Sequence, residues 1–107
     1  MKVVWAKQAS ESLQQIALYI YDNFGFDAKQ KFLSEVIDML SSLEFNPYIG
    51  KLDPYMEGFP TEYRCVFIHR RSKMVYYVEN NDIVIAAFTD ARRDPEEFAN
   101  SFVKDNL

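Results

Sequence analysis

The sequence contains only one cysteine, Cys65, one histidine, His69, and three glycines. A single cysteine excludes an intramolecular disulfide, and no group of cysteines and histidines has the spacing of a metal site. The chain has no glycine-rich phosphate-binding loop. No apolar run is long enough to cross a membrane, and the first residues lack the pattern of a secretion signal. We therefore expect a cytoplasmic protein that has no metal, no cofactor and no contact with a membrane.

Positive charge is also scarce. The chain of 107 residues has 12 basic and 16 acidic side chains, which give a formal net charge of −4. A protein that coats nucleic acid non-specifically presents a broad positive field, so this balance argues against that class. Half of the basic residues nevertheless lie between residues 61 and 95. The simpler interpretation is a solvated strand surface that resists aggregation, and the alternative is a local site for an anionic partner.

The length and composition predict one soluble domain over residues 1–107. Hydrophobic residues make up 49% of the chain and aromatic residues 16%, which is enough apolar surface for a single core. Three stretches rich in aromatic and β-branched residues predict strands at Tyr63–His69, Lys73–Glu79 and Asp82–Asp90. The short polar links Arg70-Arg71-Ser72 and Asn80-Asn81 predict an antiparallel meander. Met1–Trp5 is expected to add a strand.

Two amphipathic helices are predicted ahead of these strands. Apolar residues recur at helical spacing over Ser10–Phe24 and Asp27–Leu43, with Ser10 and Asp27 as the expected N-caps. Gly25 separates the helices, and Asn46-Pro47 ends the second one. Because neither helix can bury its apolar stripe alone, both should pack on one face of the sheet. The predicted fold class is α+β, with a helical hairpin on one face of a small antiparallel sheet.

A short C-terminal helix is predicted after Pro95, over residues 96–107. Proline suits its first turn, and acidic residues follow directly. Phe98, Phe102 and Val103 are the side chains that could dock this helix on the rest of the domain.

Strand alternation predicts which side chains share a face of the sheet. We expect Cys65, Phe67, Met74, Tyr76 and Val78 to face the helices. The opposite face would then carry Val66, Ile68, Val75 and Tyr77. A sheet covered on one side only should be more polar on its outer face than these residues allow. The four residues are therefore a predicted partner-binding surface.

The order of these elements and four short motifs resemble the RelE/ParE family of toxins from type II toxin–antitoxin systems. The motifs are Asn46-Pro47-Tyr48-Ile49-Gly50, Tyr63-Arg64, Lys73-Met74-Val75-Tyr76-Tyr77-Val78 and Arg92-Arg93-Asp94-Pro95. The resemblance implies a toxin that arrests growth and is neutralised by a cognate antitoxin, with which it could form a hetero-oligomer. A homodimer is a further expectation.

The family includes two activities. RelE-like members cut mRNA in the ribosomal A site, and ParE-like members poison DNA gyrase. Carried over by position, Arg64, Lys73 and Arg93 would be the catalytic set of an mRNA-cleaving member. Val66, however, stands where such members have a second lysine, and Phe98 lacks the hydroxyl of the expected tyrosine.

These departures favour the gyrase-inhibiting activity. Arg92 and Arg93 would then bind the target protein through charge and hydrogen bonds. The alternatives are an mRNA endoribonuclease that acts on the ribosome, an inactive module that only binds the antitoxin, and an unrelated small binding domain.

Overall fold

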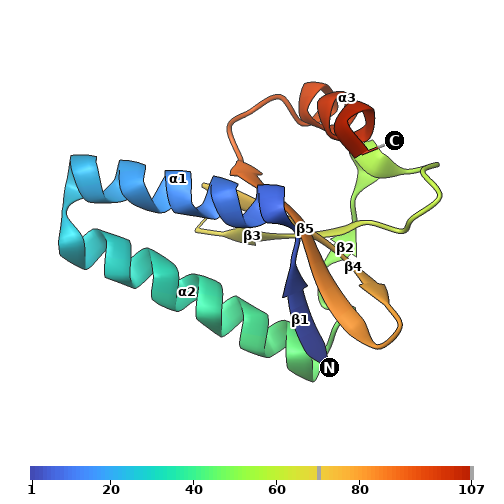
Figure 1. The fold of residues 1–107 in the computed structure, drawn as a ribbon, viewed down its shortest axis with the longest axis horizontal. Coiled ribbons are helices and arrows are strands. Elements are labelled where there is room, and N and C mark those ends of the chain that lie inside the picture. Colours follow the sequence, from blue (N-terminus) through green and yellow to red (C-terminus); the bar gives the residue numbers. More distant parts are fainter. Residues whose placement is uncertain (70, 107) are drawn as a thin grey trace.

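The computed structural model describes residues 1–69 and 71–106, and only the backbone of residues 105 and 106. Arg70, which we placed in the first strand link, and Leu107 lie outside the described residues. In chain order the elements are β1 (Lys2–Trp5), α1 (Lys7–Phe24), α2 (Phe26–Phe45), β2 (Lys51–Leu52), the 3₁₀ turn η1 (Pro54–Met56), β3 (Arg64–Ile68), β4 (Ser72–Glu79), β5 (Asp82–Asp90) and α3 (Pro95–Asn106). Figure 1 shows the sheet between the α1–α2 hairpin and α3.

The helical hairpin agrees with the sequence prediction except at its caps. α1 begins before Ser10, and Ala6 takes the cap position without a side-chain hydrogen bond. α2 also begins one residue early, so Asp27 lies in its first turn. Gly25 joins the two helices at a φ of 93°, a conformation that glycine adopts without strain. In the described part of the chain, no helix is both long and apolar enough to span a bilayer.

The sheet has five strands in the order β1-β5-β4-β3-β2. The antiparallel meander β3-β4-β5 is confirmed, and its second turn is Asn80-Asn81, with φ of 51° and 67°. β1 joins the sheet as expected, but it runs parallel to β5, so the sheet is mixed rather than purely antiparallel. β2 was not predicted, because two residues are too few to show a strand pattern.

Each face of the sheet has its own apolar cluster. Val66, Met74, Tyr76, Ile83, Ile85 and Phe88 pack with α1 and α2. Cys65, Val75 and Ala87 pack with α3 and with Met56 of η1. The register of β5 against β4 skips Ala86, which is a β-bulge, and the skip turns both Ile85 and Phe88 toward the helical hairpin.

The predicted open face is wrong in two respects. Val66 and Ile68 point toward the helical hairpin and are 7% and 4% exposed. Val75 and Tyr77 do lie on the opposite face, but Val75 is fully buried because α3 and η1 cover that face. The four residues therefore form no common surface.

The register of the β3–β4 turn explains the error. Ile68 pairs with Ser72, which leaves three positions, 69–71, in the turn. His69 adopts a positive φ of 55° there, and the Arg71 N–H donates to the Ile68 carbonyl. The predicted faces required a turn one residue longer or shorter, and such a shift reverses every side chain of a strand. Cys65 and Phe67 consequently lie on the α3 side rather than under the helical hairpin.

The docking of α3 agrees with the prediction. Asp94 caps the helix, because its Oδ1 accepts the N–H groups of Glu96 and Glu97. Phe98 and Phe102 are buried against the sheet, and the Phe102 ring lies edge-on to Tyr63 at 5.4 Å between centroids. This helix gives the domain its second core.

Candidate functional site

Arg64 is held by the loop that follows α2. Its Nη1 donates to the Gly50 carbonyl at 2.8 Å, and its guanidinium lies 5.0 Å from the centre of the Tyr48 ring. Tyr76 fixes the same loop, since its hydroxyl donates to the Pro47 carbonyl at 2.8 Å and accepts the Gly50 N–H at 2.9 Å. Burial raises the pKa of Tyr76, which keeps this hydroxyl protonated. The loop motif, Arg64 and Tyr76 thus form one hydrogen-bonded unit.

Lys73 is buried in an ion pair on the other face of the sheet. Its Nζ lies 2.7 Å from Asp53 Oδ2, and the two side chains are 7% and 0% exposed. Asp53 Oδ2 makes no further hydrogen bond among the described atoms, while Oδ1 accepts the Tyr55 N–H at 2.9 Å. Burial raises the pKa of the neighbouring Cys65 thiol, and the Asp53 carboxylate adds to this effect. The positive charge of Lys73 is therefore paired with the Asp53 carboxylate in the protein interior.

Arg92 and Arg93 lie in the exposed turn between β5 and α3. Arg92 binds Asp90 through two pairs of atoms, Nε–Oδ1 at 3.0 Å and Nη2–Oδ2 at 2.6 Å. These hydrogen bonds lower the pKa of Asp90 and raise that of Arg92. The Arg93 guanidinium lies 5.1 Å from the centre of the Phe98 ring. Of the two arginines, Arg93 is the one whose charge faces solvent without a carboxylate in the described part of the chain.

The three cations of the predicted catalytic set are not brought together. In the β3–β4 ladder Arg64 pairs with Tyr76 and Lys73 pairs with Phe67, so the two basic side chains leave opposite faces of the sheet. Arg93 follows β5, whose last residue pairs with the first residue of β4, whereas Arg64 stands at the far end of β3. The structure therefore presents three separate cationic sites.

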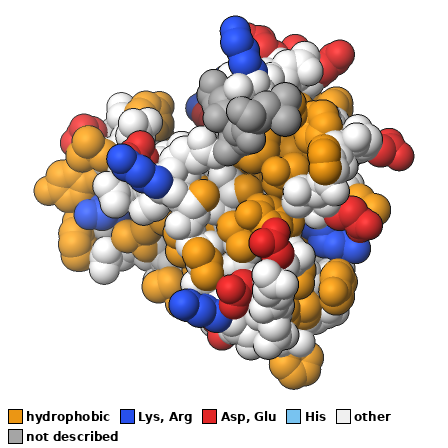
Figure 2. Space-filling view, turned by 45° about the vertical axis from the view of Figure 1, so that its right-hand side comes forward, with side chains coloured by type: hydrophobic (Ala, Val, Ile, Leu, Met, Phe, Trp, Pro, Cys, Tyr) orange, Lys and Arg blue, Asp and Glu red, His pale blue; other side chains and the backbone are white. Residues whose placement is uncertain are grey.

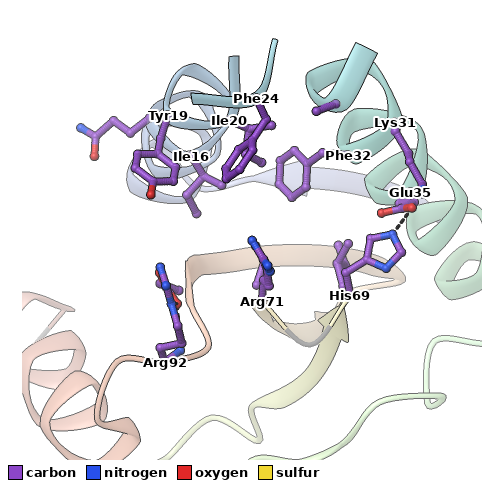
Figure 3. Close-up of a pocket in the computed structure, with 15 residues that line it drawn as sticks. Ile16, Tyr19, Ile20, Phe24, Lys31, Phe32, Glu35, His69, Arg71 and Arg92 are labelled. Carbon is purple, nitrogen blue, oxygen red and sulfur yellow. Dashed lines mark hydrogen bonds and ion pairs between the residues drawn. The ribbon is translucent and has the colours of Figure 1, made fainter. Parts of the chain in front are cut away.

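A groove of about 750 Å³ opens between the helical hairpin and one end of the sheet (Figure 3). Its helical wall is mainly apolar and includes Ile16, Tyr19, Ile20, Phe24 and Phe32. Tyr19 and Phe24 are 55% and 60% exposed, so the apolar wall continues beyond the groove onto the open surface. The sequence predictions missed this groove.

Charged side chains line the opposite wall of the groove. Arg71 and Arg92 point from the end of the sheet toward the helices, and His69 contacts Glu35 of α2 at one end (Figure 3). The second carboxylate oxygen of Glu35, Oε2, is buried and has no hydrogen-bond partner among the described atoms. Lys31 adds a further positive charge on α2. The groove thus combines an apolar wall, a basic wall and one unsatisfied acceptor.

The sequence matches the family model of the ParE toxin of type II toxin–antitoxin systems (parDE) over residues 3–95. The fold is similar to that of a chain from the chromosomal ParDE toxin–antitoxin system of P. aeruginosa, with a TM-score of 0.70 and 17% identity over 86% of this chain and 97% of that one. It is also similar to the YoeB dimer from Staphylococcus aureus, with a TM-score of 0.57 and 23% identity over 81% of this chain and 92% of that one. No curated protein sequence matches the chain.

The two similar structures support the fold alone at these identities. The family match carries the assignment, because it extends from β1 to the start of α3. This confirms the resemblance found in the sequence motifs. The chain belongs to the ParE family of toxins of type II toxin–antitoxin systems.

Proposed function

We propose that this toxin acts by binding a protein target, DNA gyrase, and not by cutting mRNA. The observation that carries the proposal is the separation of the cationic side chains. Arg64 and Lys73 lie on opposite faces of the sheet, and Asp53 neutralises Lys73 in the interior. Cleavage of RNA requires a group that activates the 2′-hydroxyl and cations that stabilise the charged phosphorane at the same place.

His69 and Glu35 contact each other in the groove that Lys31 and Arg71 also line, so they are a candidate acid–base pair near cations. His69 follows β3 and Arg64 begins it, so the five residue steps from Arg64 to His69 correspond to about 16 Å along the strand. Figure 2 also shows basic side chains that stand singly on the face it displays, among apolar and acidic ones. Binding to the negatively charged lattice of a ribosome depends on many phosphate contacts, which this charge distribution does not favour.

The test is a gyrase supercoiling assay run beside primer extension on mRNA in a translation mixture. We expect inhibited supercoiling and no cleavage at the A site. Arg93→Ala should weaken the inhibition, while Lys7→Ala, an exposed change at the start of α1, should leave it unchanged. Cleavage that Arg64→Ala or Arg93→Ala abolishes, with gyrase unaffected, would establish the endoribonuclease instead. A protein that is silent in both assays would be the inactive antitoxin-binding module.

A further inference from the structure

The helical hairpin carries a second apolar surface on the side away from the sheet. A shallow groove of about 470 Å³ runs there between the two helices, and its lining residues all belong to α1 and α2. None of them lines the groove at the end of the sheet. Most are apolar and include Leu13, Ala17, Leu18, Tyr21 and Leu33. Leu18 and Tyr21 are 59% and 47% exposed, so much of this outer hairpin face is open to water.

The apolar side of α2 is wider than the sheet can cover. Phe32 and Val36 are buried in the cluster that joins the hairpin to the sheet. Ile37, the next residue around the helix, is 61% exposed. It lies one turn from Leu33 and therefore on the same side of α2 as the outer groove. Exposed apolar side chains beside an apolar groove are typical of a protein interaction surface.

The charges of α2 favour a second copy of this chain as the partner. Lys29 and Glu44 share the stripe of Leu33 and Ile37, because the four residues are four, four and seven positions apart. Lys29 precedes Ile37 by eight positions and Glu44 follows it by seven, which is about 12 Å and about 10 Å along the helix axis. Two antiparallel α2 helices that cross at Ile37 would thus set Lys29 of each copy opposite Glu44 of the other.

A parallel pairing would instead bring like charges together, so the charge pattern selects the antiparallel one. Both charges are available for it. Neither Lys29 nor Glu44 forms an ion pair within the described part of the chain. The Lys29 Nζ lies 5.6 Å from the centre of the Tyr21 ring, which holds the cation at the edge of the outer groove.

The size of the outer hairpin face suits a weak dimer. α1 and α2 contain 18 and 20 residues. Two helices of that length side by side present roughly 30 Å by 20 Å, or about 600 Å². Stable complexes bury about 800 Å² on each partner, so this face lies at the lower end of the range. A dimer of this size should dissociate on dilution.

We propose that the outer hairpin face is a self-association surface, at which two copies of the chain pack their hairpins antiparallel about a twofold axis near Ile37. The groove at the end of the sheet stays open in each copy, because it shares no lining residue with the outer groove. The dimer is independent of the target of the toxin and goes beyond the proposed function.

Sedimentation velocity of the full chain over a range of concentrations tests the proposal. We expect the wild type to pass from monomer to dimer in the micromolar range. Ile37→Asp puts two like charges at the axis and should weaken the dimer about tenfold or more. The side chain is exposed, so far-UV circular dichroism should show an unchanged fold. Ile49→Asp is the same change at an exposed residue of the loop after α2, and it should leave the equilibrium unchanged.

A charge reversal tests the antiparallel arrangement. Lys29→Glu and Glu44→Lys should each weaken the dimer roughly fivefold, because the twofold axis repeats every pair. The double variant should restore it, since the pairs are attractive again. Two single losses without restoration would exclude this arrangement.

A chain that stays monomeric at all concentrations, or a dimer that Ile37→Asp leaves intact, would overturn the proposal. A dimer that Ile49→Asp dissociates would place the interface elsewhere. The cognate antitoxin provides the competing outcome. If the chain is monomeric and Ile37→Asp abolishes its binding to the antitoxin, the outer hairpin face belongs to that partner.

Discussion

Replacing Lys73 with methionine tests whether this lysine has a structural or a chemical role. The change removes the positive charge but keeps most of the side-chain volume. Asp53, whose side chain is 0% exposed, would then keep a buried carboxylate without its cation. Removing one partner of a buried ion pair costs about 3–5 kcal/mol in the free energy of unfolding. The total free energy of unfolding of a domain of this size is about 5–15 kcal/mol, so the expected loss is a large part of the stability.

Asp53→Asn completes a double-mutant cycle. The asparagine keeps an oxygen for the Tyr55 N–H but leaves Lys73 as an unpaired buried cation. The double variant leaves no unpaired charge, so its loss should be smaller than the sum of the two single losses, by roughly 0.5–3 kcal/mol. Urea denaturation at neutral pH, followed by far-UV circular dichroism, measures all four proteins. A loss below about 1 kcal/mol for Lys73→Met, the scale of an exposed pair, would refute this reasoning.

Three further predictions concern the loop after α2, the second core and alkaline pH. Tyr76→Phe should lower the free energy of unfolding by about 2–4 kcal/mol, because it leaves the Gly50 N–H and the Pro47 carbonyl unpaired, and an unchanged urea midpoint would contradict this. Phe102→Ala should cost about 3–5 kcal/mol through the cavity it leaves under α3. Thermal unfolding measures that loss, and Val103→Ala, at a half-buried neighbour, should cost clearly less. Finally, burial raises the pKa of Tyr76, so the stability from its protonated hydroxyl is complete below about pH 10 and is lost as the pH rises through the pKa of the folded protein. Above about pH 10, the free energy of unfolding should therefore fall more steeply with pH in the wild type than in Tyr76→Phe. Equal pH dependence in the two proteins would disprove this role of the Tyr76 hydroxyl.

The helices and the meander were predictable because their signals are local. A stripe at helical spacing, Gly25 between two stripes and Asn46-Pro47 after the second are all read within a few residues of the chain. The faces of β3 were not predictable in the same way. They depend on whether the turn after Ile68 holds two, three or four residues, and the polar stretch there is compatible with each. The bulge at Ala86 likewise leaves no mark in the composition of β5.

The candidate site shows the same division. Basic residues at positions 64, 73 and 93 are visible in the sequence, but their contacts are not. Asp53, the partner of Lys73, lies in an irregular stretch without periodicity, so nothing in the sequence pairs the two residues. The groove is lined by residues of α1, α2, the β3–β4 turn and the end of β5. Because these segments are far apart in the sequence, no single segment has a sequence pattern that predicts the groove.

The parallel pairing of β1 with β5 has a consequence for synthesis of the protein. Each residue of β1 pairs with a residue 80 positions later, as Lys2 does with Asp82. At about 5–20 residues per second, the first strand emerges roughly 4–16 s before its partner exists. The α1–α2 hairpin can form from local contacts during that interval, whereas the sheet must wait. An interrupted translation product that lacks β5 thus has no place for its N-terminal strand, and it also lacks the wall of the groove that Asp90 and Arg92 supply. The sheet and the groove can therefore form only after β5 and the turn that follows it have been synthesised.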